Sequence, residues 1–160
     1  MFRVLSDFIS EITGGHRDAA AFAENDYRLA AAVLLVHVMS IDGAVTDAER
    51  TIVKQILSSR FDLDEEHTQS LVELAIVRDA EAVDLYAFTS ILNRALDDEG
   101  RRRVVEMMFE VAYADGGLTE FEDNLVWRAA ELLHVDTRER VQIRRVVREE
   151  AETEGGQTEQ

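Results

Sequence analysis

Apolar residues recur every three or four positions along nearly the whole chain, the spacing that places them on one face of an α-helix. No segment alternates apolar and polar residues between turn residues, as a half-buried strand would. The chain contains no proline, so no helix is interrupted by one. Glycine is rare and lies mainly where the helical spacing breaks. The pattern therefore predicts an all-α protein.

The predicted helices fall into two units of three, joined by a seventh helix. The first unit covers residues 26–41, 47–59 and 65–76, and the second covers residues 99–114, 120–133 and 138–150. A helix over residues 83–96 joins the two units. The first helix of each unit is apolar nearly all round, so we expect these two helices to pack together at the centre.

Both ends of the chain are expected to lie outside a helical domain of residues 26–150. Residues 1–25 begin with an amphipathic helix over residues 2–12, whose apolar face carries Phe2, Leu5, Phe8, Ile9 and Ile12. Its polar side has two acidic residues and a single Arg, which suits anionic lipid poorly. We therefore expect it to dock on the protein's own core. Residues 151–160 are acidic, and we expect them to be disordered.

A short motif is repeated in the two units. The sequence SIDGAVTDAE over residues 40–49 returns as YADGGLTEFE over residues 113–122, so that Asp42 and Asp115 are 73 positions apart. Both copies have Asp-Gly, then Val or Leu before Thr, and a Glu three residues after the Thr. The repeat means that one helix-turn-helix unit is used twice, and that two acidic clusters come with it.

Helix termini explain most of the motif. Gly43 and Gly116 can adopt the left-handed conformation that ends a helix at low cost. Thr46 and Thr119 are expected to cap the next helix, and the Glu three residues later completes a capping box. The acidic residue directly after each Thr favours the positive end of that helix.

Capping does not explain the Asp of the motif. Asp42 and Asp115 each lie at the last turn of a helix, where the dipole disfavours a negative charge by about a few tenths of a kcal/mol. A compensating partner is therefore expected, either a cation or an Arg. Oxygen ligands suit Ca²⁺ or Mg²⁺, although the spacing is not that of an EF-hand. From spacing alone, a cation site and a purely structural cap both remain open.

Composition limits the other functions that the chain can have. A length of 160 residues fits one domain, and the absence of cysteine excludes disulfides and thiolate chemistry. The formal net charge of −16 repels phosphate, which disfavours nucleic-acid binding. The apolar run over residues 29–41 is too short to cross a bilayer. No phosphate loop or catalytic constellation is visible, so we expect no enzyme activity, organic cofactor or small-molecule substrate.

The remaining polar candidates are interpreted as structural. His37 lies on the most apolar helix and is expected to be satisfied by a neighbour, while its repeat counterpart Glu110 should face water or an Arg. The three Arg of residues 101–103 point in different directions and should form salt bridges. The last helix is locally basic and could pair with the acidic body or an acidic partner. The Glu-x-x-His of residues 131–134 lacks the second copy that a di-iron site needs.

The paired sequences SIDGAVTDAER and YADGGLTEFED, each following an apolar helix, resemble the tellurite-resistance TerB family, whose domain is similar to the N-terminal domain of DjlA-type co-chaperones. The resemblance covers about residues 26–150. It implies a seven-helix fold with an internal pseudo-two-fold repeat and a divalent-cation site. It also implies a role in stress-response or tellurite-resistance complexes near the inner face of the membrane. By position, the candidate ligands are Asp42, Asp47 and Glu49 in the first copy and Asp115, Glu120 and Glu122 in the second.

Together these features predict a non-enzymatic TerB-like module that binds a divalent cation and acts with a protein partner. We expect it to be cytoplasmic, in solution or peripheral to the inner membrane. A homo-oligomer is compatible with the sequence. The alternative is a metal-free helical scaffold for protein interaction, in which the motifs are only helix caps. A hydrolase that uses the same acids with a metal-activated water is a further hypothesis, and it would need an open cleft at the cluster.

Overall fold

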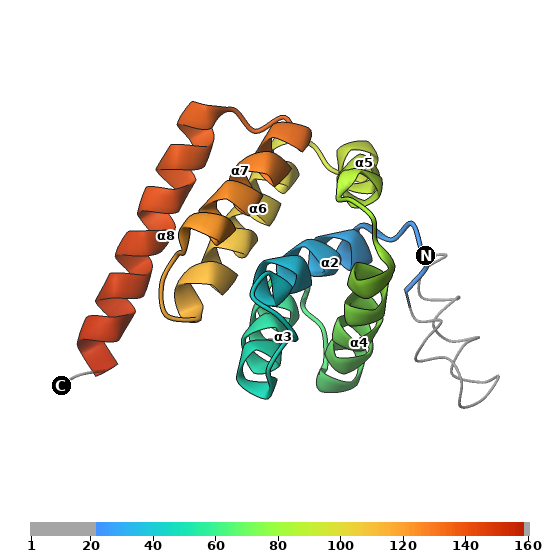
Figure 1. The fold of residues 1–160 in the computed structure, drawn as a ribbon, viewed down its shortest axis with the longest axis horizontal. Coiled ribbons are helices and arrows are strands. Elements are labelled where there is room, and N and C mark those ends of the chain that lie inside the picture. Colours follow the sequence, from blue (N-terminus) through green and yellow to red (C-terminus); the bar gives the residue numbers. More distant parts are fainter. Residues whose placement is uncertain (1–21, 159–160) are drawn as a thin grey trace.

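The computed structural model describes residues 22–158, which form seven helices and no strand (Figure 1). In chain order the helices are α2 (Tyr27–Ser40), α3 (Asp47–Phe61), α4 (Glu65–Glu81), α5 (Tyr86–Ala95), α6 (Asp98–Ala114), α7 (Glu120–Leu132) and α8 (Thr137–Thr158). The all-α prediction is confirmed. The amphipathic helix predicted over residues 2–12 lies outside the described residues. Within the described range, no helix combines the length and the apolar character that a membrane crossing requires.

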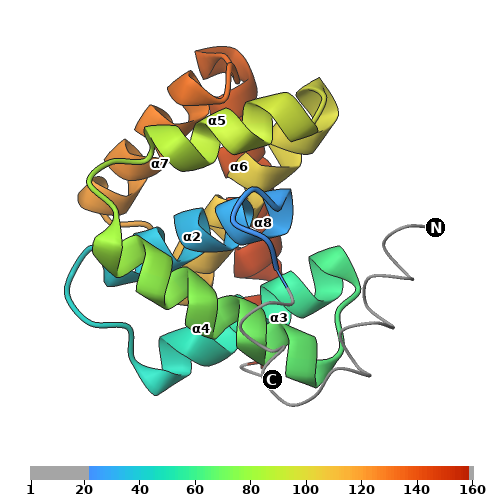
Figure 2. The ribbon, with the colours of Figure 1, turned by 90° about the vertical axis from the view of Figure 1, so that its right-hand side faces the viewer.

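Helix α2 is the centre of the bundle. It contacts α3, α4, α5, α6 and α7, and Figure 2 shows it between α5 above and α3 and α4 below. Every residue from Leu29 to Met39 is buried except His37. A helix that is apolar on all sides has to be surrounded by other elements. The apolar run of the sequence therefore dictates where α2 lies.

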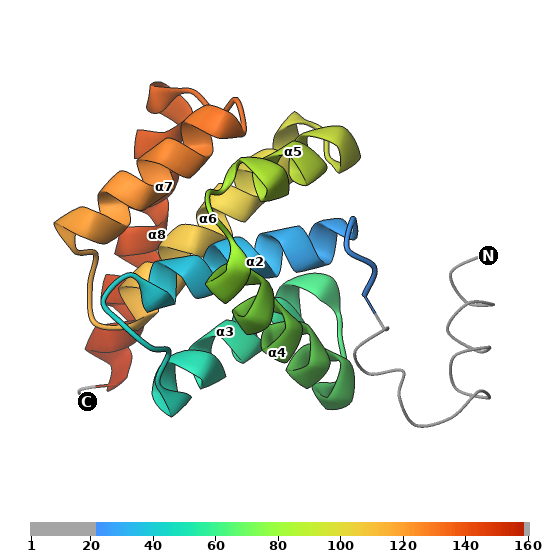
Figure 3. The ribbon, with the colours of Figure 1, turned by 45° about the vertical axis from the view of Figure 1, so that its right-hand side comes forward.

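The two units are arranged alike around this centre. In the first unit α2 packs on α3 and α4, and in the second α6 packs on α7 and α8. Between the units, the two equivalent helices α2 and α6 contact each other. Helix α3 contacts α6, and its equivalent in the second unit, α7, contacts α2. Figure 3 shows α2 and α6 next to each other in the middle of the molecule. The contacts thus occur in the equivalent pairs that a pseudo-two-fold repeat requires, with α5 as the link.

Side-chain caps determine where α3 and α7 begin. In α3, Thr46 Oγ1 accepts a hydrogen bond from Glu49 N at 3.1 Å, and Glu49 Oε1 accepts one from Thr46 N at 2.9 Å. Thr119 and Glu122 form the same pair of bonds with the same distances in α7. Both predicted capping boxes are therefore confirmed.

The backbone conformation at Gly43 and Gly116 requires glycine. Gly43 has φ of 138° and Gly116 has φ of 108°, a region that residues with a side chain rarely adopt. A Cβ atom added at either position would meet nothing within 4 Å. Conformation, and not lack of space, therefore explains why glycine ends the preceding helix in both units.

Helix α3 ends two residues beyond its predicted end, and two other helices continue further. Helix α4 runs past Ile76 to Glu81, and α8 continues to Thr158 through residues 151–158, where the sequence favoured disorder. The physical reason is that residues 151–158 contain no proline and include two Glu, a good helix former. Its two glycines each cost about 1 kcal/mol relative to Ala without breaking the backbone hydrogen bonds.

Replacing Leu34 by Ala should lower the free energy of unfolding by about 2–5 kcal/mol, because this α2 side chain is fully buried in the centre of the bundle. Urea denaturation measures the change. Val83→Ala is the control, because Val83 is 98% exposed, and its effect should stay within about 0.5 kcal/mol. Similar losses from both variants would contradict the central position of α2.

Removing a capping hydroxyl should destabilise the protein in either unit. Thr46→Val and Thr119→Val should each cost about 1 kcal/mol, because the N–H of the third helical residue loses its acceptor. Thermal unfolding followed by circular dichroism measures this. Thr51→Val is a matched control in α3, since Thr51 is exposed and its hydroxyl only bonds back to Asp47 O. If Thr51→Val costs as much, capping is not the cause.

Candidate functional site

The two Asp-Gly turns lie side by side at one edge of the bundle. Helices α2 and α6 pack together and run toward the same edge, so the turn after each helix emerges there (Figures 2 and 3). The turn between α2 and α3 carries Asp42, and the turn between α6 and α7 carries Asp115. Packing of the duplicated helices thus brings together motifs that are far apart in the sequence.

The acidic groups gather around Asp115. Its carboxyl group lies against that of Glu49, from the other turn, closely enough to share a hydrogen bond when one of them is protonated. The carboxyl groups of Glu122 and Asp42 act on it through their charge. Although Asp115 is exposed, partial loss of water around its carboxyl group is the main cause of its raised pKa, and these acidic neighbours raise that pKa further. Each unit therefore contributes one Asp and one Glu to this group, which we call the acidic cluster.

The members of the acidic cluster differ in how firmly they are held. Glu122 is only 3% exposed, and Glu49 is half-buried. One oxygen of each Glu accepts the backbone N–H of its capping box, which leaves the other oxygen outside the box. Asp42 and Asp115 are exposed on turns next to glycine. The cluster thus combines two fixed carboxylates with two that have room to adjust.

Two of the six predicted ligands lie outside the cluster. Asp47 and Glu120 are exposed at the first position of α3 and α7, and neither acts on Asp115. At the start of a helix a carboxylate interacts favourably with the positive end of the dipole. Helix stabilisation is therefore sufficient to account for these two residues.

Among the described residues, no basic side chain neutralises Asp115. All the charged groups that shift its pKa are acidic. The contrast with Asp123, one turn into α7, is clear, because both oxygens of Asp123 accept hydrogen bonds from Arg144 at 3.1 Å. Of the two partners that the sequence left open for Asp115, a cation or an Arg, the structure thus provides no Arg.

The acidic cluster is not a preformed coordination shell. In the part of the chain that the structure describes, no three acidic or imidazole side chains are already arranged to hold one metal ion. The chemistry of the donors nevertheless fits a hard divalent cation, since all four are carboxylates and the charged groups that shift the pKa of Asp115 are all acidic. Asp42, Glu49, Asp115 and Glu122 are accordingly the residues that could hold such an ion after side-chain rotation.

A clamp formed by Asp79 was missed by the sequence analysis. Asp79 Oδ1 lies 2.7 Å from His37 Nδ1, and Asp79 Oδ2 accepts a hydrogen bond from Ser40 Oγ at 2.9 Å. The clamp joins the last turns of α2 and α4 directly before the first acidic turn. It was missed because α4 was predicted to end at Ile76. The prediction that a neighbour satisfies His37 is confirmed.

Although Asp79, His37 and Ser40 are the residue types of a hydrolytic triad, they are not arranged as one. The hydroxyl of Ser40 donates to the carboxylate, whereas a triad requires it to contact the free nitrogen of the imidazole. The constellation therefore holds two helix ends together and provides no activated nucleophile.

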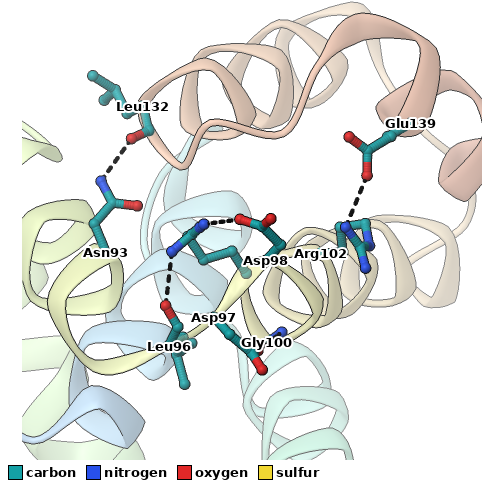
Figure 4. Close-up of polar contacts among 9 residues, drawn as sticks. Asn93, Leu96, Asp97, Asp98, Gly100, Arg102, Leu132 and Glu139 are labelled. Atoms are coloured by element: carbon teal, nitrogen blue, oxygen red, sulfur yellow. Dashed lines mark hydrogen bonds and ion pairs between the residues drawn. The ribbon is translucent and has the colours of Figure 1, made fainter.

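The other polar candidates have structural partners. Glu110 pairs with Arg60 of α3, as expected for a Glu on an apolar helix. The three consecutive Arg of α6 form salt bridges, Arg101 with Asp98, Arg102 with Glu139 and Arg103 with Glu99. Figure 4 shows Arg102 facing Glu139 of α8, and Asn93 of α5 donating to Leu132 O at the end of α7.

Glu131 and His134 do not form part of a di-iron site in the described structure. Both are exposed near the end of α7, where His134 has a positive φ of 61°. They therefore lie on the surface at a helix terminus, as predicted from the sequence.

Replacing Asp115 by Asn should stabilise the protein at pH 7 in the presence of EDTA, by about a few tenths of a kcal/mol. The raised pKa means that the folded state binds this proton more tightly than the unfolded state. The contribution of Asp115 to the free energy of unfolding therefore falls as the pH rises from the ordinary pKa of Asp through the raised pKa of Asp115. The advantage of the variant should consequently disappear near about pH 4.

Thermal unfolding of the wild type and Asp115→Asn at about pH 4 and pH 7 measures this difference. Asp62→Asn is the control, because Asp62 is exposed at the end of α3 with φ of 52°, which Asn also tolerates. A loss of stability for Asp115→Asn at pH 7 would contradict the acidic cluster.

Comparison with known proteins agrees with this architecture. The family model for tellurite resistance protein TerB matches residues 28–145, a span that begins in α2, ends in α8 and includes both acidic turns. No curated protein and no solved structure is similar enough to this chain to match it. The match covers well over half of the chain and confirms the resemblance carried by the two motifs. The chain therefore belongs to the tellurite-resistance TerB family.

Proposed function

We propose that this protein is a non-catalytic module that binds one divalent cation between its two acidic turns and acts in a protein complex. Membership of the TerB family supports a role related to tellurite resistance. The observation that carries the proposal is the meeting of the two turns, where Asp115 of one unit lies against Glu49 of the other. The duplicated motif thus supplies a single group of four carboxylates, not two separate groups.

Electrostatics supports a cation as the missing component. Four neighbouring carboxylates repel one another, and burial of Glu122 strengthens that repulsion by reducing solvent screening. A divalent cation would convert the repulsion into attraction. Ca²⁺ accepts six to eight oxygen ligands in irregular geometry, whereas Mg²⁺ demands a nearly ideal octahedron. Two fixed Glu, two adjustable Asp and water suit Ca²⁺ better.

The proposed ion would also connect the two halves of the protein. Asp42 and Glu49 belong to the first unit, and Asp115 and Glu122 belong to the second. Binding would therefore stabilise the contact between units and fix the surface that the two turns share. We propose that the module acts in the cytoplasm, where it joins a protein partner at or near the inner face of the membrane.

The alternative function is a metal-free scaffold for protein interaction. The observation that favours it is that both capping boxes are complete without an ion, while no three candidate ligands in the described chain already surround one point. In that case the motifs only end one helix and begin the next. The two functions differ in one measurable property, which is the response of the protein to Ca²⁺.

Calcium titration followed by calorimetry and thermal unfolding tests the proposal. At a hundredfold excess over the dissociation constant, Ca²⁺ should stabilise the wild type by about 2.7 kcal/mol, or roughly 5–10 °C in melting temperature for a chain of this size. The double variant Asp42→Asn/Asp115→Asn should lose most of this response, because it removes two of the four charges. A parallel titration with Mg²⁺ should give weaker binding.

Asp62→Asn is the matched control, because it removes one carboxylate outside the acidic cluster and should leave the Ca²⁺ response unchanged. The quantity compared is the change on adding the ion, since the double variant is expected to be more stable than the wild type in EDTA. Absence of a Ca²⁺ response in the wild type, or an equal response in the double variant, would favour the metal-free scaffold.

A further inference from the structure

Two hollows lie end to end along α6, on the side of α8 that faces α3. One has a volume of about 310 Å³ and lies between α3, α6 and α8. The other has a volume of about 340 Å³ and lies between α6 and α8. Val147 lines both hollows, and Arg60 of α3 pairs with a Glu beside each of them. We call the combined surface the α6–α8 groove.

The α6–α8 groove has the length of a short helix. The α6 residues that line it run from Arg102, beside the α8 contact in Figure 4, to Ala114 at the end of α6. At a rise of 1.5 Å per residue this distance is about 18 Å, or roughly three helical turns. An elongated groove of this kind is typical of surfaces that bind an amphipathic helix.

The floor of the groove is apolar. Ile52 and Ile56 of α3, Tyr113 of α6, and Ile143 and Val147 of α8 contribute to it. Val146 lies at its edge and is 43% exposed. Apart from Val147, which is buried, these side chains leave apolar surface in contact with water, and burying it against a partner would be favourable.

The rim of the groove is acidic. Its charged residues are five Glu and two Arg, namely Glu106, Glu110, Glu139, Glu150, Glu154, Arg60 and Arg102. Both Arg already pair with Glu across the groove. The lining Glu outnumber the lining Arg, and the chain as a whole has a net charge of −16. The rim therefore attracts a basic segment and repels an acidic one.

The negative charge of the rim favours some occupants of the α6–α8 groove over others. The sequence predicts an apolar face for the chain's own segment of residues 2–12, but the polar positions of this segment include Asp7 and Glu11 against only Arg3. A second copy of the chain brings a further charge of −16. Both occupants would place like charges next to the rim, whereas a partner helix with Lys or Arg beside its apolar face would be complementary.

We propose that the α6–α8 groove binds an amphipathic, Lys- or Arg-rich helix of about three turns from a partner protein. This inference rests on the part of the proposed function that places the protein in a complex, and it adds the chemistry of the partner. It does not require the cation, because the groove lies outside the acidic cluster and none of the four cluster residues lines it.

A labelled model peptide tests the groove. The probe is a fluorescein-tagged peptide of about 14 Leu and Lys residues, with Leu at helical spacing on one face. Fluorescence anisotropy with the full-length protein in EDTA, at about 0.15 M salt, should show saturable binding. Val146→Arg should weaken that binding at least tenfold, because it places a positive charge at the edge of the groove.

Val141→Arg is the matched control. Val141 lies on the same helix, is similarly exposed at 40% and lines neither hollow. It should change the dissociation constant by less than about twofold, although it adds the same charge. Circular dichroism of both variants checks that α8 remains folded. Equal weakening by the two variants would mean non-specific attraction and would overturn the inference.

Two further measurements test the helical pattern of the probe and the chain's own N-terminal segment. A peptide of the same composition in scrambled order should bind at least tenfold more weakly, and equal binding would overturn the requirement for an amphipathic helix. Phe8→Asp disrupts the apolar face of residues 2–12, and should leave probe binding unchanged. If Phe8→Asp strengthens binding tenfold, the chain's own segment covers the groove and the inference fails.

Failure of this inference can be separated from failure of the proposed function. Peptide binding in EDTA that is retained in Asp42→Asn/Asp115→Asn supports the groove whether or not Ca²⁺ binds. Absence of saturable peptide binding in a wild-type protein that does respond to Ca²⁺ overturns the groove alone.

Discussion

The packing of α2 against α6 is the contact on which the rest of the structure depends. Both helices open a structural unit, and each contains an apolar stretch, residues 29–39 in α2 and 104–112 in α6, that is mostly buried. Burying them against each other fixes how the two units are related. Because they run toward the same edge, it also decides that the turns after them meet. The acidic cluster is therefore a consequence of core packing, and not an independent feature of the surface.

The two units share a backbone plan but have diverged in their charges. Position 50 in the first unit is Arg, and its repeat counterpart in the second is Asp123. Asp123 is paired with Arg144 of α8, whereas Arg50 Nε is buried without a hydrogen-bond partner in the described structure. The Asp, Gly, Thr and Glu of the turns are retained in both units. The helix surfaces thus differ in charge between the units, while both units keep a positive-φ glycine after the Asp and a capping box at the next helix.

The sequence was sufficient to predict the helices, the repeat and the capping boxes, because each depends on local spacing and on single residues such as Gly43 and Thr46. It could not show that Asp115 contacts Glu49, since that depends on the direction in which α2 and α6 cross. The Asp79 clamp was missed for a similar reason, because the end of α4 is set by its contact with α2. The helical continuation of α8 through two glycines was likewise invisible to a rule based on composition.

The two halves of the acidic cluster belong to one polypeptide, and this determines how the cluster assembles. In a symmetric dimer, two identical turns meet only when two molecules associate, so the population of the complete group varies with protein concentration. Here α5 tethers the second turn to the first within a single chain. The acidic cluster therefore forms within a single molecule, and diluting the protein does not separate its two halves.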